Sequence, residues 1–146
     1  MKRYILLIIA ALQLNVTVIA HEGPLEEAKA ASQQWVKEFN KGNVEYMVKA
    51  YTSDSIMITH PIGVFHGSEA VLSFWSELVN GGADDLVYIE PKYELIDNET
   101  MHLSARWKMN IGEGYITQER WVKQADGVWR LAFDDFTIEK QYSQED

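Results

Sequence analysis

The sequence contains no cysteine among its 146 residues. This absence excludes a disulfide framework, a thiolate nucleophile, a zinc–thiolate site and a lipid-modified cysteine after a leader segment. The fold must therefore be held by its own hydrophobic core. With 47% apolar and 12% aromatic residues, the chain has enough apolar side chains for one compact domain.

Positive charge is also scarce. The chain has 13 Lys and Arg against 22 Asp and Glu, a formal net charge of −9. Residues 1–20 hold two of the basic residues and no acidic one, so without them the balance is 11 − 22 = −11. No basic run is present. The composition therefore argues against nucleic acid or an anionic membrane surface as a partner.

Long apolar runs are limited to the start of the chain, where Tyr4–Ile19 follows two basic residues. This run is shorter than the roughly 20 apolar residues of a membrane span, and two polar residues interrupt it. Ala20 ends a stretch typical of a signal-peptidase cleavage site. We therefore predict a cleaved signal peptide, residues 1–20, and one domain, 21–146, in the periplasm or secreted from a bacterium. An uncleaved anchor helix is the alternative.

The rest of the chain changes its hydrophobic period from helical to alternating. Helical spacing and capping residues predict three helices first, the second with Tyr51 near its end on the inner face, and a short strand pair between the second and third. A period of two then predicts strands separated by turns at "DNE", "GEG" and "ADG". Ser68 is predicted to cap the third helix, and Pro91 to mark an edge or bulge. The expected strands are 56–59, 64–65, 86–96, 100–109, 115–123 and 128–138. This order indicates an α+β fold with an antiparallel meander.

Two stretches carry a resemblance to a known family. "WVKEFNKGNVEYMVKAYTSDSIMITHPIGVFHGSEAVLSFW" and "ADGVWRLAFDDFTI" resemble the opening and closing parts of the nuclear-transport-factor-two-like superfamily, which includes ketosteroid isomerases and SnoaL-like polyketide cyclases. The resemblance covers roughly Leu25 to Ile138. It implies a cone in which a curved antiparallel sheet wraps around three helices and leaves a pocket at one end. It implies less about function, because the scaffold hosts many chemistries.

The resemblance also points to site residues. In ketosteroid isomerases the catalytic carboxylate directly precedes the Pro-x-Gly turn, a position held here by His60. The positions of the family's tyrosine and of its second acid are held by Trp35 and Glu119. An imidazole suits proton transfer near neutral pH, and a carboxyl on an apolar strand face with Thr117 and Trp121 is expected to have a raised pKa. Alternatively, His60 is a turn residue, and Glu119 pairs with a cross-strand Arg or Lys.

An aromatic pocket is the second expectation. A cone is not filled at its open end, so some aromatic side chains must line it, and we predict a small apolar or aromatic ligand. Arg106 either points inward to orient an acidic ligand or forms a surface ion pair with Asp134 or Glu119. The residues predicted to bind the ligand are Trp35, Tyr51, Phe65, Trp75 and Trp121.

Three functions stay open from the sequence. The first is a small-molecule-binding domain. The second is a cofactor-independent isomerase, dehydratase or cyclase with His60 as base and Glu119 as acid. The third is an interaction module that forms homodimers through the outer face of its sheet. We expect no cofactor and no metal; a metal site of His60, His66 and Asp134 or Asp135 is the less favoured alternative, since their spacing is typical of no ligand motif.

Overall fold

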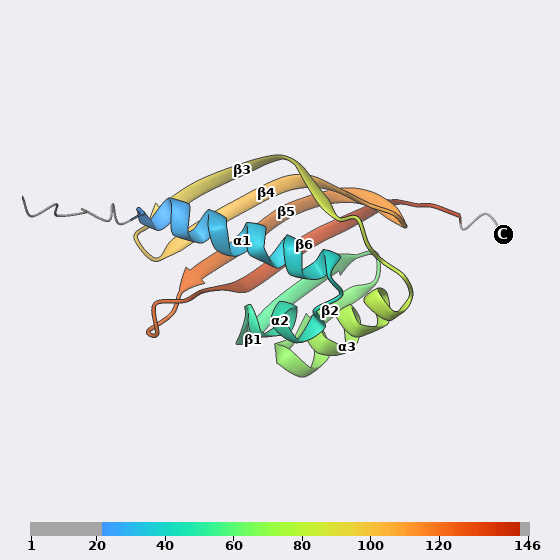
Figure 1. The fold of residues 1–146 in the computed structure, drawn as a ribbon, viewed down its shortest axis with the longest axis horizontal. Coiled ribbons are helices and arrows are strands. Elements are labelled where there is room, and N and C mark those ends of the chain that lie inside the picture. The colour runs from blue at the N-terminus through green and yellow to red at the C-terminus, as the bar shows by residue number, and fades with distance from the viewer. Residues whose placement is uncertain (1–21, 144–146) are drawn as a thin grey trace, which may run out of the picture.

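A six-stranded curved sheet forms the body of the protein (Figure 1). The computed structural model describes residues 22–143, so the predicted signal peptide lies outside the described residues. The strand order is β2-β1-β6-β5-β4-β3, and the sheet is not closed. The strands are β1 (Tyr51–His60), β2 (Gly63–His66), β3 (Val87–Asp97), β4 (Thr100–Met109), β5 (Gly112–Lys123) and β6 (Trp129–Gln141). The predicted α+β class is confirmed.

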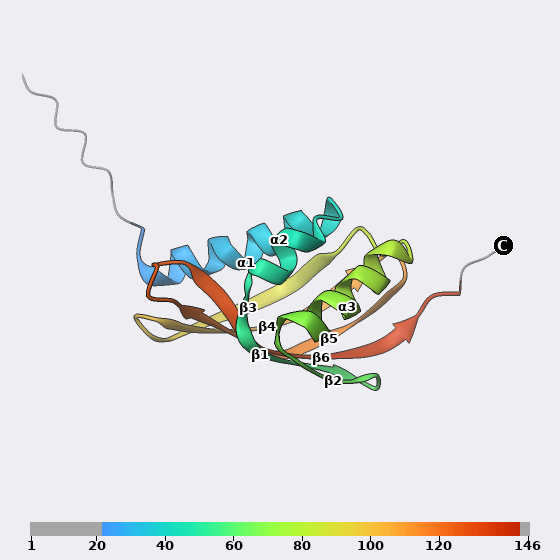
Figure 2. The same cartoon turned by 90° about the horizontal axis from the view of Figure 1, so that it is seen from below.

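Three helices lie on one face of this sheet, as Figure 2 shows. They are α1 (Pro24–Asn40), α2 (Val44–Lys49) and α3 (Gly67–Asn80). α1 begins at a proline, and Asn43 caps α2 by accepting a hydrogen bond from the backbone N–H of Tyr46. The predicted cap at Ser68 is wrong, because α3 already begins at Gly67, with His66 in the capping position.

The sheet departs from a simple meander at β1. This strand pairs antiparallel with β2 but parallel with β6, the last strand of the chain. β1 is also longer than predicted and begins at Tyr51, which we expected at the end of the second helix. The parallel pair joins residues 51–60 to the last strand of the chain, a long-range contact that local periodicity does not encode.

Irregularities in the strands decide which side chains face inward. β3 shifts register between Ile89 and Lys92, around Pro91, as predicted. β5 shifts register between Ile116 and Gln118, so that Ile116 and Glu119 are both buried although they are three residues apart. Thr117, expected to share a face with Glu119, is exposed.

Side-chain hydrogen bonds fix the helices to the sheet. Asn40 at the end of α1 exchanges two hydrogen bonds with the backbone of Leu86, just before β3. At the other end of α1, Glu27 accepts hydrogen bonds from Lys123 and from the indole of Trp129. Among the described residues, no helix is long and apolar enough to cross a membrane.

Candidate functional site

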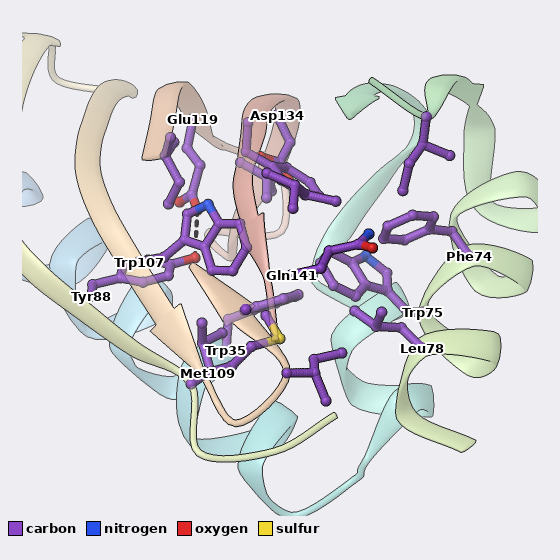
Figure 3. Close-up of a pocket in the computed structure, with 18 of the residues that line it drawn as sticks. Trp35, Phe74, Trp75, Leu78, Tyr88, Trp107, Met109, Glu119, Asp134 and Gln141 are labelled. Carbon is purple, nitrogen blue, oxygen red and sulfur yellow. Dashed lines mark hydrogen bonds between the residues drawn. The ribbon is translucent and has the colours of Figure 1, made fainter. Parts of the chain in front are cut away.

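A cavity of about 340 Å³ lies between the inner face of the sheet and the helices (Figure 3). α1 and α3 supply one wall and strands β3 to β6 the other. Ile62 in the β1–β2 turn and Gln141 at the end of β6 also line the cavity and are exposed to solvent, so they mark its rim. The size is that of a site for a small molecule.

Aromatic rings form much of the cavity wall. Trp35 and Trp75 meet edge to face, with ring centroids 5.1 Å apart, and Trp75 stacks on Phe136 at 6.0 Å. The Trp35 indole donates to the backbone oxygen of Met47, 3.2 Å away, which fixes its orientation. These rings are held by packing from three different elements, so the apolar wall is preformed.

Glu119 is the first of two carboxyl groups in this wall. It is 2% exposed, and it accepts hydrogen bonds from Tyr88 Oη at 2.7 Å and from Trp121 Nε1 at 2.6 Å, one on each oxygen. Burial raises the pKa of Glu119 to about 7, although both hydrogen bonds act to lower it. This carboxyl therefore titrates in the neutral range.

Asp134 is the second carboxyl and stands directly opposite Glu119 in the β5–β6 register. It is 4% exposed, and its Oδ2 accepts a hydrogen bond from Tyr51 Oη at 2.7 Å. The Tyr51 oxygen in turn accepts a hydrogen bond from Trp75 Nε1 at 3.2 Å. Within the described chain, no residue donates to the other oxygen, Oδ1. Burial and the adjacent Glu119 raise the pKa of Asp134 well above its ordinary value.

Trp107 also lines this cavity and carries a buried N–H without a partner in the described chain. The side chain is 6% exposed, and its indole Nε1 has no partner among the described residues. Gly114 on the next strand leaves room for this ring: a Cβ there would lie 2.8 Å from Trp107 Cζ2 and 1.9 Å from the oxygen of Thr137. The "GEG" segment is thus part of β5 and not a turn, contrary to the prediction. A buried donor without a partner is uncommon and needs an explanation.

The structure does not bring His60 and Glu119 together. The His60 side chain is 55% exposed at the end of β1, and its Nε2 lies 3.2 Å from Asp135 Oδ1. His60 does not line the main cavity. The prediction that the two residues act on one bound molecule is therefore wrong. Because β1 ends beside the outward-facing Asp135, the side chain at the turn points away from the cavity.

The other predicted residues divide into two groups. Trp35, Tyr51 and Trp75 line the cavity, as does Glu119. Phe65 packs on Phe74 with centroids 5.0 Å apart, and Trp121 is fully buried beneath Glu119; neither lines the cavity. Their expected contact with the ligand is not supported by this geometry. Trp121 acts instead by holding the Glu119 carboxylate.

The remaining charged candidates lie outside the site. Arg106 is exposed and pairs with Glu139, so neither the inward orientation nor a pair with Glu119 or Asp134 is observed. The alternative metal set is also divided, because Asp134 faces the cavity while His60 and Asp135 lie together outside it. Across residues 22–143, no three His, Asp or Glu side chains come together as a metal site would require.

Tyr88, Asp134 and Trp107 carry polar groups of the site that sequence reasoning did not place in the pocket. One signal for Asp134 was available: "FDDF" puts two aspartates side by side in a strand, where one of them must face the helices. The free indole of Trp107 had no such signal, because a tryptophan in a strand is usually a core residue.

Solved structures establish the fold. A ketosteroid isomerase-like protein from Erwinia carotovora atroseptica matches with a TM-score of 0.65 and 15% identity, over 80% of this chain and 96% of the other. A candidate scytalone dehydratase from Novosphingobium aromaticivorans matches with a TM-score of 0.69 and 9% identity, over 83% and 87%. A nuclear-transport-factor-two-like protein with a cystatin-like fold from the same genus gives 0.64 and 10%, over 79% and 81%.

The likeness defines a structural class. The chain has the cystatin-like fold of nuclear-transport-factor-two-like proteins, as the sequence resemblance predicted. No family model matches the sequence, and no curated protein is similar to it at the level of sequence. Function must therefore be argued from the cavity itself.

Proposed function

We propose that this protein binds a small, mostly apolar molecule in the aromatic cavity. The observation that carries the proposal is a preformed space of about 340 Å³ whose wall is mainly aromatic and aliphatic, with a few buried polar groups. Binding sites for small molecules have this composition, because apolar contact supplies affinity and a few polar groups set orientation.

Two leucines of α3 provide a test with a matched control. Leu78 lines the cavity, whereas Leu72 is 44% exposed on the same helix. Calorimetric titration with 2-naphthylmethanol, a neutral apolar probe, is expected to show saturable binding. Leu78→Trp fills the cavity and should weaken binding by about tenfold or more, while Leu72→Trp should not. Absence of binding to the parent protein, or equal losses in both variants, would contradict the proposal.

A second candidate function is acid–base catalysis without a cofactor, with the carboxyl pair in place of His60. Its support is the adjacency of two buried carboxyls with raised pKa values in a cavity, an arrangement that allows one to hold a proton while the other is ionised. Asp134 would donate a hydrogen bond to a ligand carbonyl oxygen. Glu119, when ionised, would accept a proton from the adjacent carbon and leave an enolate whose oxygen Asp134 stabilises. Glu119 would exchange this proton with solvent and return one to the carbon.

Deuterium exchange at the α-carbon of 2-tetralone, followed by NMR in D₂O, tests this second function. The parent protein should accelerate exchange, and Asp134→Asn should reduce the rate by about 100-fold, within the usual contribution of a positioned acid or base. Asp135→Asn, a neighbouring change outside the cavity, should keep the rate. An unaccelerated reaction, or equal rates for the two variants, would exclude this candidate.

We also propose export and self-association. The leader pattern supports removal of residues 1–20. Ile89 and Tyr115, 41% and 37% exposed, flank Arg106 on neighbouring strands and offer an apolar surface for a second copy of the chain. N-terminal sequencing of protein from the culture medium or periplasm, and light scattering after size-exclusion chromatography, test the two proposals. Retention of residues 1–20, or a monomer at high concentration, would refute them.

A further inference from the structure

The polar part of the cavity is acidic, with no positive side chain to balance it. Glu119 and Asp134 both line it, and none of its described lining residues is Lys, Arg or His. Two basic side chains on β4 and β5 are engaged elsewhere: Arg106 pairs with Glu139, and Lys123 pairs with Glu27. A buried carboxylate without a cation is costly, so the cavity lacks the partner that would allow both groups to ionise.

One carboxyl oxygen in the cavity can accept a hydrogen bond from such a cation. Glu119 has both oxygens occupied, by Tyr88 and Trp121. Asp134 uses Oδ2 for Tyr51, whereas Oδ1 accepts no hydrogen bond from any described residue. Asp134 is 4% exposed and lines the cavity, so a group that binds Oδ1 must come from inside the cavity. The hydrogen bonds that Tyr88 and Trp121 donate to Glu119, and that Tyr51 donates to Asp134, hold the two carboxyls in place.

The aromatic wall suits the same kind of group. Trp35, Trp75 and Trp107 line the cavity beside the acidic pair. The π-face of a tryptophan attracts a cation, most strongly where water is excluded, and aromatic cages with a carboxylate recognise ammonium groups on this basis. The net charge of −9 attracts a cationic ligand toward the protein as well.

We propose that the ligand of this cavity is an apolar amine, held as its ammonium cation by Asp134 beside Glu119. This inference rests on the proposed function and names the chemical class of its ligand. In the empty cavity Asp134 keeps its proton. When the ammonium binds, the Asp134 proton leaves for solvent, and an ammonium–carboxylate pair replaces it. Charge in the cavity stays balanced, with one proton released for each cation taken up.

The groups that face Asp134 agree with this exchange. Glu119 on β5 raises the pKa of Asp134, as does Asp135 on its own strand, while Tyr51 on β1 lowers it by hydrogen bonding. Trp75 on α3 reaches Asp134 through Tyr51 and carries no charge. A neutral ligand does not balance the negative charge of the two carboxylates, and a carboxylate ligand adds a third negative charge.

Three probes of one shape but different charge test the inference: 2-naphthylmethylamine, 2-naphthylmethanol and 2-naphthoate. Calorimetric titration at neutral pH should show the amine binding about tenfold more tightly than the alcohol, the difference between a charge-assisted and a neutral hydrogen bond. The naphthoate should bind most weakly. Repeating the amine titration in buffers of different ionisation enthalpy should show release of about one proton, and the alcohol should release none.

Two neighbouring aspartates supply the matched variants. Asp134→Asn should remove the preference for the amine and the proton release while the alcohol still binds. Asp135→Asn, whose side chain lies beside His60 outside the cavity, should preserve both. If the alcohol binds the parent protein as tightly as the amine, or if both variants keep the preference, the inference is overturned and the proposed function stands. If none of the three probes binds, the proposed function itself fails.

Discussion

Asp134 and Asp135 are neighbours in one strand, yet they belong to different regions of the molecule. Asp134 faces the cavity, is 4% exposed and bonds to Tyr51. Asp135 faces the other side of the sheet, where His60 stands 3.2 Å away with a side chain that is 55% exposed. We call the first the inner carboxyl site (Glu119, Asp134) and the second the outer corner (His60, Asp135).

The comparison shows how burial changes the protonation of acidic groups. Both regions contain an acidic group near a partner that can exchange or donate a proton. In the inner carboxyl site, low solvent access raises the pKa values of the two acids and makes every hydrogen bond to them significant. In the outer corner, His60 is 55% exposed while the Asp135 Oδ1 beside it is buried, so water screens the contact from the histidine side and the pair contributes little.

The largest expected effect comes from removing the support under the inner carboxyl site. Trp121 is 1% exposed and donates to Glu119, so Trp121→Ala should lower the free energy of unfolding by about 3–5 kcal/mol. Tyr115→Ala, on the outer face of the same strand, should change it by about 0.5 kcal/mol or less. Urea unfolding followed by circular dichroism measures both. Similar losses of unfolding free energy in the two variants would mean that the inner and outer faces of β5 contribute equally to stability.

A pH dependence of stability should follow from Glu119. The pKa of Glu119 is about 7 in the folded protein against an ordinary value of 4.5, so between these values the folded state holds the proton more tightly than the unfolded state. This contribution is fully present below pH 4.5 and is lost as the pH rises through 7. It amounts to on the order of 3 kcal/mol, and the raised pKa of Asp134 acts in the same direction.

The variant Glu119→Gln removes the contribution of this carboxyl to the pH dependence of stability. Its unfolding free energy should fall less between mildly acidic and mildly alkaline pH than that of the parent protein. Glu45→Gln, an exposed change on α2, should retain the parent slope. A slope in Glu119→Gln as steep as in the parent would show that another group is responsible.

Tyr51→Phe should have an intermediate effect. The change leaves Asp134 Oδ2 and Trp75 Nε1 without their shared partner, which costs about 1–3 kcal/mol. Tyr46→Phe is the control, since Tyr46 is 38% exposed and should tolerate the loss of its hydroxyl. Thermal or urea unfolding distinguishes them, and an equally stable Tyr51→Phe protein would mean that the Trp75–Tyr51–Asp134 chain is not a structural unit.

The smallest effect is expected in the outer corner. His60→Ala removes an exposed side chain with one contact to Asp135 and should change the unfolding free energy by about 1 kcal/mol or less. Binding of 2-naphthylmethanol should be unchanged. A large loss of affinity in His60→Ala would instead place this residue in the binding site and reverse the comparison.

Much of the fold was predictable because local patterns determine it. The three helices, the bulge at Pro91 and the strand 100–109 follow from period, capping and proline chemistry. The parallel pairing of β1 with β6 was not, because it joins segments far apart in the sequence. Tyr51 was predicted in the second helix but begins β1 for the same reason, because pairing with a distant strand outweighs its local propensity.

The site was predicted in part, and the error has a physical cause. Trp35, Tyr51, Trp75 and Glu119 line the cavity as expected. His60 was selected by its position before a turn, but a turn position does not determine which face of the strand a side chain occupies. The β5 bulge between Ile116 and Gln118, which brings Glu119 inward, depends on cross-strand packing that the sequence alone does not display.

We expect the inner carboxyl site to retain a proton near neutral pH, the property on which the chemistry proposed for the cavity depends. Titration of the side-chain carboxyl carbons by ¹³C NMR tests it directly. We expect a pKa of about 7 for Glu119 and a pKa for Asp134 well above its ordinary value. Asp126, whose pKa is lowered by its hydrogen bonds to Arg130, serves as the internal reference. If Glu119 and Asp134 both titrate within the ordinary carboxyl range, the claim is wrong.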